Sequence, residues 1–312
     1  MSYADEVYEQ WKNENPLVAR STPRRINEGH AIAVPKIVAP VPDQTVYSIP
    51  EEVFAHSIGH YERNQFARLL HQHFGCTVAD ELLQRFQIGT SARWPGSCVF
   101  WYIDEDGRKR GGQIKLFGDD WHTEKYIDRD GKKQPKTSWV NSALVRRLQA
   151  KQLPIPEWLA TYERHAQRSP CLFGLPQLLT QPADKPVAIV EAPKTAVVCS
   201  AYFPRFIWLA IGSLSYLTTH TTMGMSRLAP LRYRKIAFFP DLSIQGSALA
   251  RWSRTADELR ELGYVVTVSD YLEKRATDEE RKAGLDLADY LLGQWKGYPP
   301  DWDKSAEQPR PG

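Results

Sequence analysis

The second half of the chain alternates short apolar runs with stretches of helical character. Runs of strand length occur at 187–190, 206–211, 235–239 and 264–268. The segments between and after them predict helices, among them "SALARWSRTADELRELG" and "KAGLDLADYLLGQW". Continuous apolar strands that alternate with helices favour a parallel sheet with both faces covered. In such a sheet, ligands bind at the carboxyl ends of the strands.

The first half has a different pattern. Residues 50–86 are predicted to be helical, with Phe66, Leu69, Leu70 and Phe74 on one face. A second helix is predicted to begin at Thr77, with Asp80 in a capping-box position. Further on, "CVFWYIDEDGRKRGGQIKLFG" predicts two strands around a Glu-Asp-Gly turn. These patterns divide the chain into a flexible segment at 1–45, an α+β domain at 46–180, an α/β domain at 181–297 and a disordered tail at 298–312.

Composition narrows the class of protein. The net charge of +3 permits nucleic-acid binding without demanding it. The four cysteines form no CxxC pair, which argues against a zinc ribbon or a disulfide scaffold and fits a reducing cytoplasm. No apolar run reaches the roughly 18 residues of a membrane span, and the acidic N-terminus is unlike a signal peptide. We therefore expect a cytoplasmic protein without a membrane partner.

Acidic residues follow the predicted strands. Glu191, Asp241 and Asp270 each stand at the end of a strand. Asp286 and Asp289 lie in the loop and first turn of the last helix. Carboxylate oxygens at one sheet edge are what hard divalent cations bind. A single acid at such a position is also a common helix cap, and Asp286 in particular is suited to cap the last helix.

The stretches "VAIVEAPKTA", "KIAFFPDLSIQG" and "GLDLADYL" resemble the Toprim domain shared by bacterial primases, topoisomerases and some nucleases. The resemblance implies a Rossmann-like α/β fold with a mostly parallel four-stranded sheet. It implies Glu191 as the catalytic glutamate, assisted by Asp241 and by Lys194 of the Glu-x-x-Lys pattern. It also implies a site for Mg²⁺ or Mn²⁺, with ligands at Glu191, Asp241, Asp286 and Asp289.

Upstream, "CVFWYIDEDGRKRGGQIKLF", "PKTSWVNSAL" and "LFGLPQLL" are similar in order to DnaG-type primase cores. The whole arrangement resembles primase-like proteins of bacterial mobile elements. Two features depart from that pattern. Ser243 replaces the second acid of the Asp-x-Asp pair, so Ser243 itself or Asp270 is a further possible ligand. The N-terminal zinc-binding module has no counterpart, so no zinc is expected and a separate zinc-binding protein or helicase is a possible partner.

The implied chemistry is phosphoryl transfer, in which a 3′-hydroxyl attacks the α-phosphate of a nucleotide while a metal ion neutralises charge. A polyanionic substrate then needs basic side chains along its path. Candidates for contacts with single-stranded DNA are Lys115, Lys132, Lys133, Lys136, Arg232, Arg234 and Lys235. Three hypotheses follow: a Mg²⁺-dependent primase-type nucleotidyltransferase that uses DNA and nucleotides, a catalytically degenerate Toprim protein that only binds single-stranded nucleic acid, and a Toprim nuclease.

Overall fold

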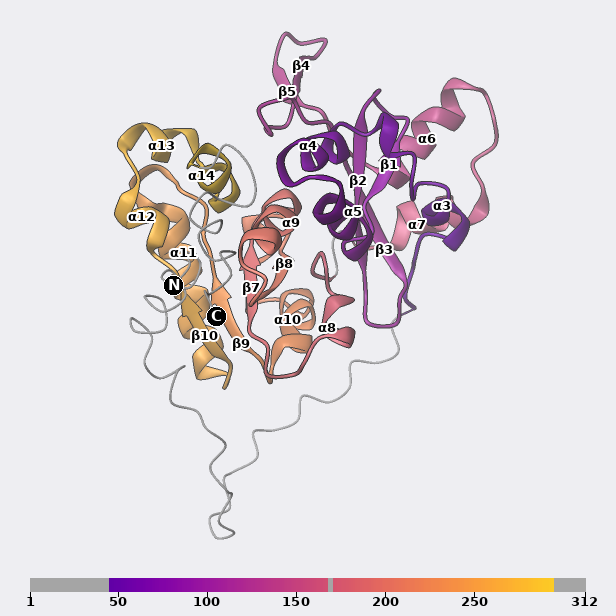
Figure 1. The fold of residues 1–312 in the computed structure, drawn as a ribbon. Helices are drawn as coiled ribbons and strands as arrows, with labels where there is room; N and C mark the ends of the chain where they lie inside the picture. The colour runs from indigo at the N-terminus through magenta and orange to yellow at the C-terminus, as the bar shows by residue number, and fades with distance from the viewer. Residues whose placement is uncertain (1–44, 168–170, 295–312) are drawn as a thin grey trace, which may run out of the picture.

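The computed structural model describes residues 45–167 and 171–294. Among these residues it contains a four-stranded antiparallel sheet on one side and a four-stranded parallel sheet on the other, with helices α4, α5 and α9 between them (Figure 1). The two fold classes predicted from the sequence are confirmed. Except for Thr45, the predicted flexible segment at 1–45 lies outside the described residues, and so does the predicted tail at 298–312.

The N-terminal helices pack their apolar faces on the antiparallel sheet. Helix α4 (Gln65–Phe74) begins where the Asn64 side chain accepts a hydrogen bond from the Ala67 amide. Its predicted apolar face is buried as expected. Helix α5 (Cys76–Arg85) starts directly after Gly75, so the capping box expected at Thr77 and Asp80 is wrong. The preceding short elements are α3 (Glu51–Ala55) and the 3₁₀ turn η1 (Tyr61–Arg63).

The antiparallel sheet has the strand order β1-β2-β3-β6. Its strands are β1 (Gly89–Ser91), β2 (Ser97–Ile103), β3 (Lys109–Lys115) and β6 (Thr137–Trp139). Strands β2 and β3 form the predicted hairpin. Between β3 and β6 the chain forms a separate two-stranded hairpin, β4 (Lys125–Ile127) and β5 (Lys133–Pro135). Helices α6 (Val140–Ala150) and α7 (Glu157–His165) follow.

The parallel sheet has the order β10-β9-β7-β8, and each neighbouring pair is parallel. Its strands are β7 (Val187–Val190), β8 (Ile207–Ala210), β9 (Lys235–Phe238) and β10 (Val265–Val268). Its longer helices are α9 (Pro193–Tyr202), α10 (Thr222–Leu228), α11 (Ser247–Glu261) and α14 (Leu287–Gln294). Shorter elements are α8 (Gln177–Thr180), α12 (Tyr271–Arg275), α13 (Asp278–Ala283), η2 (Leu214–Tyr216), η3 (Ala229–Leu231) and η4 (Ile244–Gly246).

The strand order creates a switch point between β7 and β9. From β7 the chain moves to β8 on one side, and it then crosses to β9 on the other. The loops that leave the carboxyl ends of β7 and β9 therefore diverge to opposite sides. Such a point in an open α/β sheet is where ligands bind. The fold thus singles out the loops after Val190 and Phe238.

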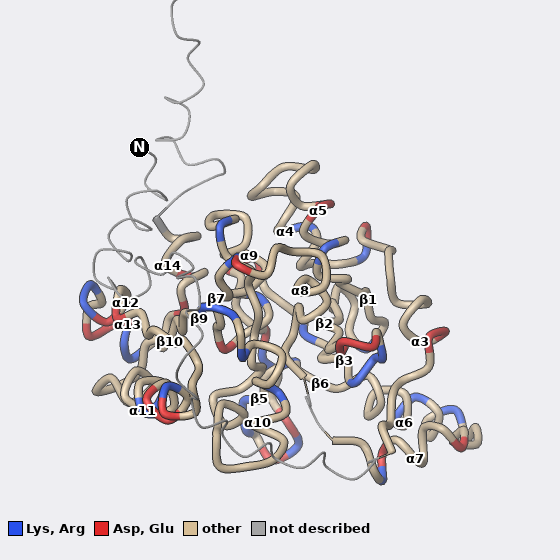
Figure 2. The backbone as a smooth tube through the Cα atoms, turned by 90° about the horizontal axis from the view of Figure 1, so that it is seen from below, with Lys and Arg blue, Asp and Glu red and all other residues tan. Residues whose placement is uncertain are grey.

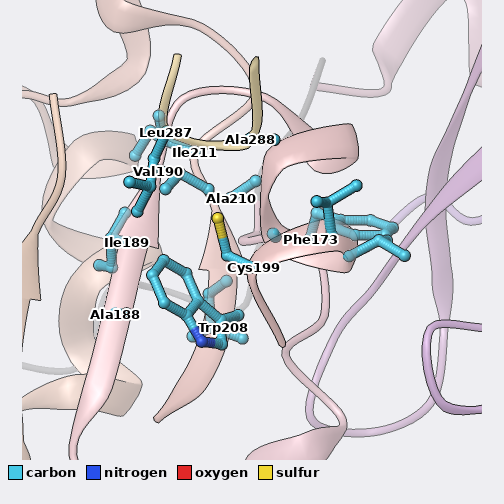
Figure 3. Close-up of a cluster of buried hydrophobic side chains, with 14 of the residues drawn as sticks. Phe173, Ala188, Ile189, Val190, Cys199, Trp208, Ala210, Ile211, Leu287 and Ala288 are labelled. Carbon is cyan, nitrogen blue, oxygen red and sulfur yellow. The ribbon is translucent and has the colours of Figure 1, made fainter. Parts of the chain in front are cut away.

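One hydrophobic cluster joins the two sheets. It contains Phe100 and Tyr102 of β2 together with Ile189 and Trp208 of the parallel sheet. Phe173 links the two parts, because its backbone pairs with Ala210 beside β8 while its ring packs on Phe100. Figure 3 shows Phe173 beside the buried side chains of the parallel sheet. Among the described residues, no helix has the length and apolar character to cross a bilayer.

Candidate functional site

Glu191 and Asp241 lie at the switch point of the parallel sheet. Glu191 directly follows β7, and Asp241 stands three residues after the end of β9. Both side chains are partly buried. Because β7 and β9 are adjacent and parallel, their carboxyl ends bring the two acids to the same edge. We call this group, with Asp286 and Asp289, the acidic edge.

One oxygen of the partly buried Asp241 carboxylate lacks a hydrogen bond. Its Oδ1 atom is enclosed by protein and has no hydrogen-bond partner. Burial raises the pKa of Asp241 well above its ordinary value, and the nearby charges of Asp286 and Glu191 raise it further. A buried charge that lacks a partner is costly to the fold. The position is therefore one where a bound cation would relieve an electrostatic penalty.

Asp286 and Asp289 have a cation already. The Lys194 ammonium, from the first turn of α9, lies 3.2 Å from Asp286 and also forms an ion pair with Asp289. All three side chains are at least nine-tenths buried. Burial opposes the charge on Lys194, but the two aspartates outweigh it and raise its pKa. Burial likewise opposes the charge of Asp286, yet Lys194 and the Thr195 hydroxyl keep its pKa below the ordinary value.

The two aspartates also build the start of helix α14. The Asp289 amide donates to Asp286 Oδ1 at 2.8 Å, and the Asp286 amide donates to Asp289 Oδ2 at 3.1 Å. This is the reciprocal arrangement of a capping box. Asp286 therefore does cap the last helix, the structural alternative noted from the sequence. The capping does not exclude a ligand role, because each carboxylate has further lone pairs.

Thr195 is a member of the site that the sequence did not single out. Its hydroxyl donates a hydrogen bond to Asp286 Oδ2 at 2.5 Å. The only sequence signal is its position directly after Lys194, in the first turn of the helix that follows Glu191. Asp286 is 91 residues away, so no local pattern could pair the two.

Ser243 and Asp270, the further ligands considered from the sequence, each have another partner in the structure. The Ser243 hydroxyl accepts a hydrogen bond from the Ala248 amide at 2.8 Å, at the start of α11. Asp270 is 44% exposed and forms an ion pair with Lys274 at 3.1 Å. Asp270 is also absent from the charges that dominate the pKa of Asp241. Ser243 thus stabilises a helix start, and Asp270 pairs along its own helix.

The donors at the edge suit one divalent cation better than two. Within 45–167 and 171–294, no three His, Cys, Asp or Glu side chains converge as a preformed metal centre. Asp241 nevertheless offers an enclosed carboxylate oxygen with no other partner, and the charge of Glu191 acts on it. Carboxylate oxygens are the preferred ligands of Mg²⁺, which commonly binds through one or two of them. Asp241 and Glu191 fit that requirement, whereas Lys194 compensates Asp286 and Asp289.

Lys115 connects the antiparallel sheet with this edge. It ends β3, is partly buried, and forms no ion pair with any described residue. Burial lowers its pKa, and the other charges that act on it are those of Cys98, Lys194, Asp286 and Glu191. A cation from the first half of the chain therefore lies within electrostatic range of acids from the second half. Of the basic residues expected to contact DNA, Lys115 is the one on which charges of the acidic edge act.

The other basic candidates lie elsewhere. Lys132 and Lys133 are exposed on the β4–β5 hairpin, and Lys136 at its base pairs with Glu124 at 2.7 Å. Arg232, Arg234 and Lys235 precede or begin β9, so they lie at the opposite end of that strand from Asp241. The expectation that these three flank the acidic edge is wrong, since a strand separates its two ends.

Arg232 and Arg234 have structural contacts at their end of the sheet. The Arg234 guanidinium donates hydrogen bonds to the backbone carbonyls of Leu178 and Pro182. The Arg232 guanidinium lies over the ring of Tyr264. These contacts fix the loops around the start of β9. Binding of nucleic acid by Arg232, Arg234 and Lys235 stays a prediction.

Comparison with known proteins gives a family and distant structural likenesses. A family model described as a domain of unknown function (DUF6371) matches residues 64–242, which include Glu191, Lys194 and Asp241. No curated protein sequence matches the chain. The primase fragment of the bacteriophage T7 primase-helicase protein aligns with a TM-score of 0.40 and 14% identity, over 80% of this chain and 75% of that one. The E. coli primase catalytic core aligns with a TM-score of 0.34 and 15% identity, over 70% of this chain and 64% of that one.

Proposed function

The chain belongs to the DUF6371 family, and we propose that it is a Toprim-type nucleotidyltransferase of the primase kind. Its substrates would be single-stranded DNA and nucleotides, and its cofactor Mg²⁺ or Mn²⁺. The observation that carries this proposal is the enclosed, unpartnered Oδ1 of Asp241 at the switch point of a parallel sheet. A buried carboxylate of this kind persists in a fold when its charge serves function.

Each residue of the edge has a distinct part in the proposal. Asp241 and Glu191 would hold the divalent cation, which would neutralise charge on the reacting phosphate oxygens. Lys194 holds the starts of α9 and α14 together through its ion pairs with Asp286 and Asp289. Lys115 would contact a substrate phosphate from the antiparallel sheet, because it has no ion-pair partner among the described residues. Glu191, directly after β7, is also the candidate for proton transfer.

A second function is favoured by a different observation. Lys194 already compensates Asp286 and Asp289, and Ser243 stands where the resembled pattern has a second acid. An edge with fewer free carboxylates binds a divalent cation more weakly. This supports the alternative of a degenerate Toprim protein that binds single-stranded nucleic acid without chemistry. A Toprim nuclease would use the same acids and is separated from the other two by its product.

Calorimetric titration of Mg²⁺ and Mn²⁺ tests the proposed cation site. We expect the wild type to bind in the millimolar range and Asp241→Asn to lose the binding. Asp257→Asn is the matched control, because Asp257 is 69% exposed on α11 and pairs with Arg260. In metal-free buffer, Asp241→Asn should melt higher than the wild type, since it removes a carboxylate whose charge is enclosed without a hydrogen-bond partner. A folded Asp241→Asn that binds the cation like the wild type would contradict the proposal.

Product analysis then separates the three activities. Primer synthesis on single-stranded DNA that Glu191→Gln abolishes is the result expected for a nucleotidyltransferase. Primer synthesis that survives Glu191→Gln would sink the proposed role of the acidic edge. Metal-dependent nicking without synthesis would indicate the nuclease. DNA binding with neither product would favour the accessory binding protein.

A further inference from the structure

The β4–β5 hairpin projects from the body of the molecule (Figure 1). None of its residues belongs to either hydrophobic cluster of the described residues. Tyr126 is 42% exposed and Ile127 is 64% exposed. A two-stranded hairpin with both faces in water is marginal in stability on its own. Its exposed aromatic and aliphatic side chains therefore need an explanation other than packing of the core.

Hydrogen bonds at the base and the turn hold the hairpin in place. At the base, the Leu116 amide donates to the Lys136 carbonyl, and the Glu124 amide donates to the Leu116 carbonyl. At the turn, Asp128 Oδ1 accepts from the Asp130 and Lys132 amides at 3.0 and 2.8 Å. The hairpin is thus ordered by its backbone and by one turn residue. The exposed side chains along it are not needed for this order.

The charge of the hairpin is mainly positive. Lys125, Arg129, Lys132 and Lys133 are exposed, and none of them forms an ion pair with a residue that the structure describes. Of the two acids between them, Asp128 is occupied by turn amides and by Gln134 at 2.9 Å. Over residues 125–135 the four cations therefore stand against two aspartates, a formal net charge of +2. Like charges held close together repel one another, and an anionic partner removes that repulsion.

The base of the hairpin is bonded to the segment that directly follows Lys115. Its base pairs with Leu116, the residue after Lys115. Lys115 in turn lies within the electrostatic range of Lys194, Asp286 and Glu191. A polyanion bound at the acidic edge and on Lys115 can therefore continue onto the hairpin.

We infer that the β4–β5 hairpin is an arm that holds single-stranded DNA as it passes the acidic edge, with phosphates on its four cations and an unpaired base stacked on Tyr126. Phosphate contacts of lysine and arginine supply affinity through counterion release. The exposed Tyr126 ring offers a stacking surface, which unpaired bases can use and the stacked bases of a duplex cannot. The inference deepens the proposed function and rests on it for the DNA path, but it does not require catalysis.

Fluorescence anisotropy with a labelled oligothymidylate, in EDTA and over a series of salt concentrations, tests the arm in the full chain. Lys132→Glu/Lys133→Glu should bind at least tenfold more weakly, and the slope of log K against log salt should fall by about 1.4, at about 0.7 for each lost phosphate contact. Tyr126→Ala should bind about tenfold more weakly with an unchanged slope, because stacking carries no charge. Tyr126→Phe keeps the ring and should bind like the wild type.

A matched charge reversal supplies the control. Arg251 and Arg254 are exposed on α11, where Figure 2 shows basic and acidic positions side by side. Arg251→Glu/Arg254→Glu changes the net charge by the same amount as the hairpin pair and should leave binding within about twofold. If both double charge reversals weakened DNA binding equally, the effect would be one of net charge alone, and the arm would be overturned. The arm would also be overturned if the hairpin variants bound DNA as tightly as the wild type, or if the wild type did not bind at all. A preference of the wild type for a duplex of the same sequence would overturn it as well.

The outcome for the arm and the outcome for the catalytic proposal are separable. DNA binding in EDTA involves no cation at Asp241, so a loss of affinity in the hairpin variants is measured independently of the metal site. Hairpin variants that bind like the wild type, in a protein that still synthesises primers, would remove the arm and leave the nucleotidyltransferase. Hairpin-dependent binding in a protein without cation binding or primer synthesis would leave the arm and support the accessory protein.

Discussion

Asp104 and Asp241, which both have enclosed carboxylate oxygens, show how local partners decide the state of a carboxylate. Asp104, at the turn between β2 and β3, accepts hydrogen bonds from the Asp106 and Arg108 amides and from the side chains of Arg108 and Arg110. Burial alone would raise its pKa, but these contacts outweigh burial and lower it. Asp241 lacks such donors, and its pKa is raised. The first carboxylate stabilises a turn, whereas the second is available to a ligand.

Replacement of Asp104 tests its contribution to stability. Asp104→Asn should lower the free energy of unfolding at neutral pH by about 2 kcal/mol, the loss of charge-assisted hydrogen bonds. Because the folded-state pKa is depressed, this stabilisation is present above the ordinary pKa of about 3.9 and disappears as the pH falls through the folded-state value. Urea titrations at neutral and acid pH should therefore show a difference between wild type and variant that shrinks in acid.

The control for Asp104 is its neighbour in the same turn. Asp106 is 67% exposed and pairs only with Arg108. Asp106→Asn should change the free energy of unfolding by less than about 1 kcal/mol, as for other exposed ion pairs. A difference for Asp104→Asn that stays constant with pH would contradict the linkage argument.

At the scale of elements, one lysine joins two helix starts. Lys194 lies in the first turn of α9, and Asp286 and Asp289 begin α14. A positive charge near a helix N-terminus is unfavourable by itself. The two aspartates of the neighbouring helix stabilise the Lys194 charge at this position. The capping hydrogen bonds between them hold both carboxylates in place. Helix α14 is therefore docked by charge as well as by its buried Leu287 and Ala288.

A double-mutant cycle measures this docking. Lys194→Met removes the cation and leaves two buried carboxylates, so it should destabilise the protein by about 3–5 kcal/mol. Asp289→Asn combined with Lys194→Met should restore part of this loss, with a coupling of about 1 kcal/mol or more. Urea unfolding of the four proteins gives the coupling. Strictly additive losses would show that Lys194 does not act through Asp289.

At the scale of the molecule, the antiparallel and parallel sheets share one core. The cluster runs from Phe66 and Phe100 through Phe173 to Ile189 and Leu291. Phe173 is fully buried and packs on Phe86, Phe100 and Tyr102. The cluster thus crosses the boundary predicted at 180–181. A shared core keeps Lys115 of the first sheet in a fixed relation to the acids of the second.

Unfolding experiments test the shared core. We expect the wild type to unfold in one transition, with coincident curves from circular dichroism and tryptophan fluorescence. Phe173→Ala should shift both curves together and cost about 3–5 kcal/mol, as for other buried phenylalanines. Phe173→Leu keeps most of the volume and should cost clearly less. Two separate transitions in the wild type would mean that the sheets are independent domains.

The local patterns of the sequence were sufficient for the four parallel strands, for the β2–β3 hairpin and for the positions of two acids. Strands β7 to β10 are continuous apolar runs, a signal that needs no long-range information. Parallel strands have their carboxyl ends at the same edge of the sheet. Since Glu191 and Asp241 each follow such a strand, the pattern also predicted that both lie at that edge. The hairpin of β2 and β3 was specified by its turn residues.

Only the tertiary structure decided which charges meet. Lys194 pairs with Asp286 and Asp289 from a segment more than 90 residues away, and Asp241 is left with an enclosed carboxylate oxygen that has no hydrogen-bond partner. The same long-range packing brings Lys115 to the acidic edge and places Arg234 at the other end of β9. The reason is that a side chain's charge state depends on burial and on neighbours in space, and sequence spacing fixes neither. The sequence alone determined the kinds of residue at the edge, and the packing of two sheets on one core determined how each is used.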